Sequence, residues 1–186
     1  MSAGFQKKEK EKMERKKLIL IGLPQVGKTS IIARWIKGIY SEKYLSTIGV
    51  KIDKKEMVID GQELLLQIWD LAGSTDLSGP ARCYIRGAHA CLLVADGTRS
   101  DTLDAALQLK WQLRTSLGEI PFALAINKLD LFDSWQITQS RIEELKQSGL
   151  FIVLTSAKSG DGVELAFDSL ARRAIADQSS KQQRVV

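Results

Sequence analysis

Residues 22–29 decide the fold, and they read Gly22-Leu23-Pro24-Gln25-Val26-Gly27-Lys28-Thr29. They match the pattern GxxxxGK[ST], which forms a phosphate-binding loop when it stands between a strand and a helix. An apolar run at 18–22 precedes the loop, and a stretch of helical periodicity at 28–37 follows it. Glycines let backbone N–H groups turn toward phosphate, and the helix points its positive dipole end at the same place. The stretch therefore predicts a P-loop NTPase.

The rest of the chain alternates short apolar runs with longer stretches of helical periodicity, which is typical of a parallel sheet covered by helices. The predicted strands are 18–22, 51–59, 63–69, 90–95, 122–127 and 151–155. The predicted helices are 28–37, 103–116, 136–147 and 162–176, with an irregular or partly helical stretch at 74–87. Asp60-Gly61 predicts a tight hairpin between the second and third strands. We expect an α/β fold with a mostly parallel six-stranded sheet, one antiparallel edge strand and helices on both faces.

The length of 186 residues fits one domain, predicted at 18–177, with a charged tail at 1–17 and a polar tail at 178–186. Apolar residues make up 44% of the chain, so a buried core can form. No apolar run approaches the roughly 18 residues of a membrane helix, and the start resembles no secretory signal. We therefore expect a cytoplasmic protein whose two cysteines, Cys83 and Cys91, are buried thiols.

The net charge of +5 is local, because residues 1–17 hold seven basic and three acidic side chains. The remainder carries only +1, so it offers no basic face for a nucleic-acid backbone. We expect no nucleic-acid partner. The tail is interpreted as a solubilising arm, with weak contact to an anionic membrane surface as the alternative.

Several polar residues at predicted strand ends suit a nucleoside triphosphate. Lys28 can reach the β and γ phosphates, and the hydroxyl of Thr29 is placed for Mg²⁺. Asp70 follows the strand 63–69 and would hold Mg²⁺ through water, while the N–H of Gly73 could donate to the γ phosphate.

Two later motifs concern the base. Asn127-Lys128-Leu129-Asp130 follows the strand 122–127, and Ser156-Ala157-Lys158 follows 151–155. A carboxylate at Asp130 can accept from N1–H and the exocyclic amino group of guanine, whereas adenine lacks that pair of donors. The pattern favours guanine.

With these motifs in this order, residues 17–176 resemble the Ras superfamily of small GTP-binding proteins, and most closely its Rab branch. The Rab likeness rests on Ser46-Thr47-Ile48-Gly49-Val50, Leu66-Gln67-Ile68-Trp69-Asp70 and Tyr84-Ile85-Arg86-Gly87-Ala88-His89. The resemblance implies a GTP/GDP switch that uses Mg²⁺ held at Thr29, Thr47 and Asp70. The implied nucleotide contacts are Gly22, Pro24, Gln25, Val26, Gly27, Lys28, Thr29, Ser30, Tyr40, Tyr44, Thr47, Gly73, Asn127, Lys128, Asp130, Ser156, Ala157 and Lys158.

The resemblance also implies roles in the loops. Thr47 becomes the switch threonine that senses the γ phosphate, Tyr40 packs on the guanine ring, and Tyr44 closes over the phosphates. Ordinary surface aromatics remain the alternative for both tyrosines.

The resemblance implies that effector, exchange-factor and activating proteins bind the switch loops and a surface at Ile52, Trp69 and Tyr84. The alternative for Trp69 is that it is a core residue. His89, the only histidine, is expected to pack and to have no catalytic role.

The implied catalytic set is Lys28, Thr47, Gly73 and Ser74, and it departs from the family. Ser74 stands where the family has a glutamine that orients the attacking water. Pro24 has no N–H to offer a phosphate. In addition, no arginine occurs at 39–47, so we expect no intramolecular arginine finger of the heterotrimeric G-protein type.

These departures leave two functions open. The first is a GTPase switch with slow intrinsic hydrolysis, and the second is a GTP-binding interaction module that does not hydrolyse. Asp130 disfavours a P-loop kinase or ATPase. The chain ends Gln183-Arg184-Val185-Val186, so we expect no prenyl anchor.

Overall fold

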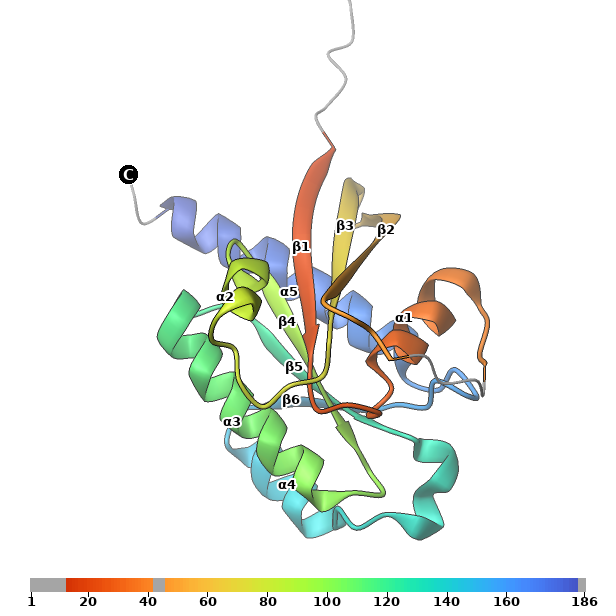
Figure 1. Cartoon of the computed structure of the whole chain (residues 1–186). Coiled ribbons are helices and arrows are strands. Elements are labelled where there is room, and N and C mark those ends of the chain that lie inside the picture. Colours follow the sequence, from red (N-terminus) through yellow and green to blue (C-terminus); the bar gives the residue numbers. More distant parts are fainter. Residues whose placement is uncertain (1–12, 42–45, 184–186) are drawn as a thin grey trace, which may run out of the picture.

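The computed structural model describes residues 13–41 and 46–183 (Figure 1). The strands are β1 (Glu14–Ile21), β2 (Val50–Ile59), β3 (Gln62–Leu71), β4 (Ala90–Asp96), β5 (Phe122–Asn127) and β6 (Phe151–Leu154). The α-helices are α1 (Lys28–Lys37), α2 (Pro80–Ile85), α3 (Ser100–Leu117), α4 (Gln139–Gln147) and α5 (Val163–Gln183). A 3₁₀ helix, η1 (Leu129–Ser134), follows β5. None of the helices in the described part has the length and hydrophobicity to cross a membrane.

The strands form one sheet in the order β2-β3-β1-β4-β5-β6. Every pairing is parallel except that of β2 with β3, which the turn Asp60-Gly61 joins. The predicted six-stranded, mostly parallel sheet with one antiparallel edge strand is confirmed.

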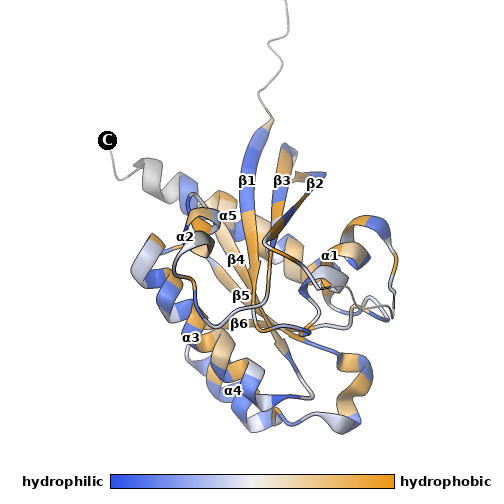
Figure 2. Ribbon diagram, viewed as in Figure 1, coloured by the Kyte–Doolittle hydropathy of each residue, from blue (hydrophilic) through white to orange (hydrophobic). Residues whose placement is uncertain are grey.

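Alternate residues of the central strand β1 enter two separate cores. Leu18 and Leu20 pack against α1 and α5, whereas Ile19 and Ile21 pack against α2, α3 and α4. This follows from the period of two in a strand that helices cover on both faces. Figure 2 shows the result as apolar central strands flanked by helices of mixed hydropathy.

The start of β1 differs from the prediction because the polar side chains of its first residues hid it. β1 begins at Glu14 rather than at 18, and its register with β3 starts at the pair Glu14 and Leu64. Lys16 is fully buried there, with its ammonium 2.8 Å from Glu14 and bonded to the amide of Gln178 on α5. Its aliphatic stem can be buried while its charge is satisfied. The predicted charged tail therefore ends several residues before 17.

Other predicted boundaries also shift. Helix α5 continues to Gln183, so most of the predicted polar tail is helical. Helix α3 begins at Ser100 and α4 at Gln139, each three residues from its predicted start, and η1 was not predicted.

The cysteines and the histidine occupy different environments. Cys91 is buried, and burial raises the pKa of its thiol. Cys83 lies exposed on α2, so the prediction that both thiols are buried is wrong for this one. His89 makes two hydrogen bonds with the backbone of Lys17. The backbone N–H of His89 donates to Lys17 O at 2.9 Å, and its imidazole Nδ1 accepts from the N–H of Lys17 at 3.0 Å. It thus prolongs the contact between β1 and β4, as a packing residue would.

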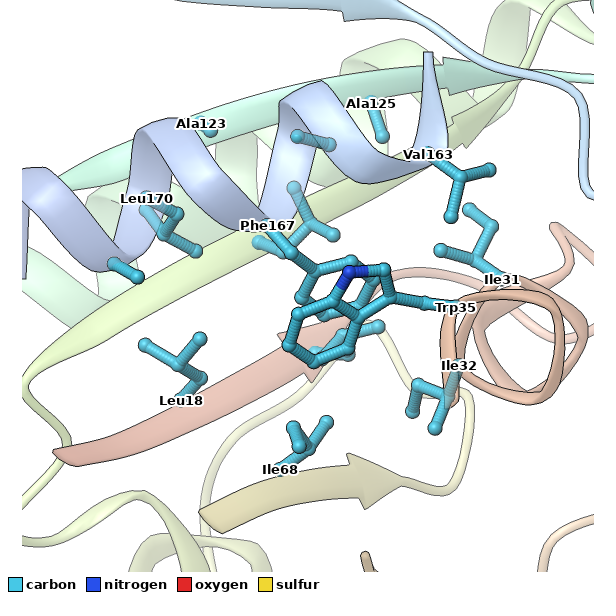
Figure 3. Close-up of a cluster of buried hydrophobic side chains, with 14 of the residues drawn as sticks. Leu18, Ile31, Ile32, Trp35, Ile68, Ala123, Ala125, Val163, Phe167 and Leu170 are labelled. Carbon is cyan, nitrogen blue, oxygen red and sulfur yellow. The ribbon is translucent and has the colours of Figure 1, made fainter. Parts of the chain in front are cut away.

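One aromatic pair joins α1 to α5 over the sheet. The rings of Trp35 and Phe167 stack with centroids 4.0 Å apart and 10° between their planes. Figure 3 shows the pair among aliphatic side chains from the strands and both helices. Phe167 is completely buried.

We expect Phe167→Ala to lower the free energy of unfolding by about 3–5 kcal/mol, because it leaves a cavity beside Trp35. Leu165→Ala is the control on the same helix, since that side chain is 56% exposed and should change stability by about 0.5 kcal/mol or less. Urea unfolding followed by circular dichroism measures both. Equal losses would contradict the assignment of the core face of α5.

Candidate functional site

The functional residues gather where the parallel strands end. β1, β3, β4, β5 and β6 all point the same way, so the residues that follow them share one edge of the sheet. The residues at this edge are Gly22, Asp70, Asp96, Asn127 and Ser156. Ligands of open α/β sheets bind outside this edge.

The phosphate loop turns tightly between β1 and α1. Gly27 caps the helix with φ 99°, and a Cβ there would lie 2.3 Å from Nδ2 of Asn127, so only glycine fits. Lys28 folds back into the loop, where its ammonium donates to the carbonyl oxygens of Gly22 (2.9 Å) and Leu23 (3.0 Å). Burial lowers the pKa of Lys28 to about 8, although the negative charge of Asp70 acts in the opposite direction and raises it. An anion in the loop would compensate the buried ammonium.

The three predicted metal ligands lie together. Thr29 Oγ1 donates to Oδ2 of Asp70 at 2.5 Å, and Thr47 Oγ1 lies 3.0 Å from Thr29 Oγ1 and 3.4 Å from Asp70 Oδ2. The other carboxylate oxygen, Oδ1, is buried and has no hydrogen-bond partner among the described residues. Burial raises the pKa of Asp70, although the hydrogen bonds from the two threonines and the charge of Lys28 oppose the rise. Hydroxyl and carboxylate oxygens with one unsatisfied acceptor fit a small divalent cation.

The segment after β3 contacts the phosphate loop. A Cβ on Gly73 would come within 2.3 Å of the nitrogen of Pro24, so glycine permits this close approach. Ser74 is engaged in its own turn: its hydroxyl donates to the carbonyl oxygen of Asp76 at 2.9 Å and accepts from the N–H of Asp76 at 3.0 Å.

Asn127 connects the phosphate loop to the loop after β6. Its Nδ2 donates to Val26 O at 2.9 Å, and its Oδ1 accepts from Ala157 N at 3.1 Å and from Thr155 Oγ1 at 3.3 Å. Asp130 is exposed, and its Oδ1 accepts from Ser156 Oγ at 2.5 Å. Asp130 Oδ2 and further lone pairs remain for a ligand.

Sequence reasoning missed a buried carboxylate at the end of β4. Asp96 Oδ2 lies 2.6 Å from Nζ of Lys128 and 3.2 Å from Nε of Arg99, and Oδ1 accepts from Thr98 Oγ1 at 2.7 Å. Burial would raise the pKa of Asp96, but the hydrogen bonds from Lys128 and Thr98 and the charge of Lys128 lower it overall. The signal was available, since Asp96 follows an apolar run just as Asp70 and Asn127 do.

Three of the predicted nucleotide contacts are exposed or lie outside the part of the chain that the structure describes. Tyr40 is beyond the end of α1 and 39% exposed, and Tyr44 lies outside the described residues. Lys158 exposes its side chain while its carbonyl oxygen accepts from Arg34.

The predicted partner surface spans β2, β3 and α2. Ile52 is exposed and stands opposite Trp69 in the β2–β3 register, and Tyr84 is half-buried on α2. The ammonium of Lys17 lies 3.7 Å from the centroid of the Trp69 ring, which is half-buried.

The comparison with known families agrees with this geometry, because the Ras family model matches residues 17–176. The chain belongs to the Ras family. It is 32% identical to the Ypt/Rab-type GTPase YPT7 of Saccharomyces cerevisiae over 86% of this chain and 81% of the yeast protein. It is 32% identical to human Ras-related protein Rab-30 (87% and 80%) and 36% identical to RABA4a of Arabidopsis thaliana (83% and 69%).

These matches confirm the resemblance to Rab-type small GTPases drawn from the motifs. As a Ras family protein, the chain is a GTP-binding switch of a GTPase family and has regulator and effector partners of the general family kind.

Proposed function

We propose that this Ras family member is a Rab-like switch that binds GTP and GDP with Mg²⁺ and hydrolyses GTP slowly. The observation that carries the proposal is the convergence of Thr29, Thr47 and Asp70. Thr47 belongs to the segment between α1 and β2, whereas Thr29 lies in the first turn of α1 and Asp70 lies near the end of β3. A ligand that binds all three would therefore hold Thr47 against the other two, and its loss would release Thr47.

The same three residues would hold the metal. Mg²⁺ bound there would neutralise charge on the β and γ phosphates. Thr29 and Thr47 would offer hydroxyl oxygens, and Asp70 would offer the buried Oδ1 that lacks a partner within the described part of the chain.

We expect chelation of Mg²⁺ by EDTA to speed GDP release from the wild-type protein about tenfold, equivalent to about 1.4 kcal/mol of binding. In Thr29→Val release should already be fast and EDTA should change it less than about twofold. Thr115→Val on α3, whose hydroxyl donates to Trp111 O, is the control and should keep the full EDTA effect. Release of a fluorescent GDP measures all three, and a full EDTA effect in Thr29→Val would contradict the ligand assignment.

Asp130 is proposed to select the base. Its carboxylate is held in place by Ser156 and keeps acceptor capacity toward solvent. A carboxylate so placed suits the N1–H and amino donors of guanine.

Asp130→Asn should weaken GDP binding and strengthen xanthosine diphosphate binding, because the new amide can donate to the 2-oxo group of xanthine. Asp133→Asn, three residues later on η1, is the control and should leave the preference for guanine unchanged. Competition assays with the two diphosphates test this. If both affinities of Asp130→Asn move in the same direction, Asp130 does not read the base.

Slow hydrolysis is proposed from the residues on the γ-phosphate side. A serine hydroxyl is shorter by about two bonds than the usual glutamine amide, and that of Ser74 bonds to the backbone of Asp76. Pro24 removes one backbone donor from the phosphate loop. The same two residues support the alternative, a GTP-binding interaction module without hydrolysis.

We expect wild-type single-turnover hydrolysis at or below the roughly 3–5 × 10⁻⁴ s⁻¹ of unassisted Ras. Ser74→Gln should raise the rate about tenfold, equivalent to about 1.4 kcal/mol, because the longer amide could accept from water and donate to phosphate. Thr75→Gln is the neighbouring control and should not accelerate the reaction. A wild-type rate above about 10⁻² s⁻¹ would mean that another residue orients the water, whereas no phosphate release over hours would favour the alternative.

Partner proteins are proposed to dock on the surface of Ile52, Trp69 and Tyr84 beside the switch loops. Its support is the exposure of Ile52 directly opposite Trp69 on the neighbouring strand. The cytoplasmic location stays a prediction from the sequence.

A further inference from the structure

One residue of the phosphate loop, Gln25, has a backbone conformation that is unfavourable for a residue with a side chain. Gln25 adopts φ 65°, in the left-handed region that a residue with a side chain rarely enters. Such a conformation is disfavoured and persists only where surrounding contacts hold it. The preceding residue is Pro24, which has no N–H, so the N–H of Gln25 is the first available donor after that position.

An arginine outside the loop holds this part of the backbone. Nη2 of Arg99 donates to the carbonyl oxygen of Pro24 at 3.0 Å, and Nε of the same guanidinium donates to Oδ2 of Asp96 at 3.2 Å. The side chain of Asp96 is 1% exposed and that of Arg99 is 37% exposed, so the pair is anchored in the protein at its acidic end. Lys128 and Thr98 fix Asp96 further.

The carbonyl oxygen that Arg99 binds and the N–H of Gln25 belong to the same rigid peptide unit. The carbonyl of Pro24 and the N–H of Gln25 lie in the same planar trans peptide and point in opposite directions. A hydrogen bond that draws the carbonyl toward Arg99 therefore turns the N–H to the other side of the loop.

We propose that Arg99 is a positioning residue that orients the Pro24–Gln25 peptide so that the Gln25 N–H can donate to a phosphate of the bound guanine nucleotide. The inference rests on the proposed nucleotide site and adds a residue from the start of α3 to it. Because Asp96 also binds Lys128, one carboxylate connects this peptide to the loop that carries Asp130.

The role depends on the shape of the guanidinium. Its planar fork presents separate donors to Asp96 and to Pro24, whereas a lysine ammonium is a single point charge on a flexible stem. Arg99→Lys keeps a positive charge beside buried Asp96 and loses the two-pronged contact. It therefore separates the positioning role from the ion pair more cleanly than alanine does.

The test measures GDP release and amide exchange in the full chain. We expect Arg99→Lys to release a fluorescent GDP about tenfold faster than wild type. In the GDP complex, hydrogen exchange of the Gln25 amide, followed by NMR, should accelerate about tenfold while the Lys28 amide stays unchanged. Arg114→Lys, on α3 itself and paired with Glu119 at the surface, is the matched control and should behave as wild type in both measurements. If Arg99→Lys does not fold, Arg99→Gln replaces it with the same expectation, since the glutamine amide nitrogen takes the place of Nε and lies two bonds short of the Nη2 that reaches Pro24.

The outcomes are distinguishable. Wild-type protein that binds no GDP would overturn the proposed function itself. Wild-type protein that binds GDP, with Arg99→Lys releasing it within twofold of the wild-type rate, would overturn only the role of Arg99. Faster release with unchanged exchange at Gln25 would overturn it too, because Arg99 would then act elsewhere than on this peptide.

Discussion

The candidate site depends on the amide of Asn127, which fastens two loops at one edge of the sheet. One end of the amide donates to Val26 in the phosphate loop, and the other accepts from Thr155 and Ala157 after β6. The amide is almost fully buried, so each lost bond would leave an unsatisfied polar group at a cost of about 1–3 kcal/mol. This one side chain therefore ties the phosphate loop to the loop after β6.

Two buried carboxylates at the same edge of the sheet, Asp96 and Asp70, differ in their hydrogen-bond partners and in the direction of their pKa shifts. Asp96 is saturated by Lys128, Arg99 and Thr98, and its pKa is lowered despite burial. Asp70 keeps one oxygen without a partner in the described structure, and burial raises its pKa. The saturated carboxylate suits a fixed support, whereas the unsaturated one suits a ligand.

The sequence predicted the sheet because β1, β4, β5 and β6 contain short apolar runs and the turn pair Asp60-Gly61 marks the hairpin of β2 and β3. It predicted most site residues because they stand at the ends of the predicted strands. It misplaced the start of β1 because Lys16 is a charged residue buried through its stem and two polar partners. The last turns of α5 were missed because they carry no apolar periodicity. Arg99 could not be predicted, since its contact with Pro24 joins residues 75 positions apart and no motif specifies it.

The departures from the family pattern all lie on one side of the site. Pro24 and Ser74 are the residues proposed to face the γ phosphate, and Gln25 with its positive φ follows Pro24. The residues proposed for the base and the metal contact one another, Asp130 with Ser156 and Thr29 with Asp70. In the proposed function, nucleotide binding and turnover would draw on different residues, so retention of nucleotide could coexist with slow chemistry. On the same proposal, a contact that supports the altered loop, such as that of Arg99, would affect how long nucleotide stays before it affected how fast GTP is cleaved.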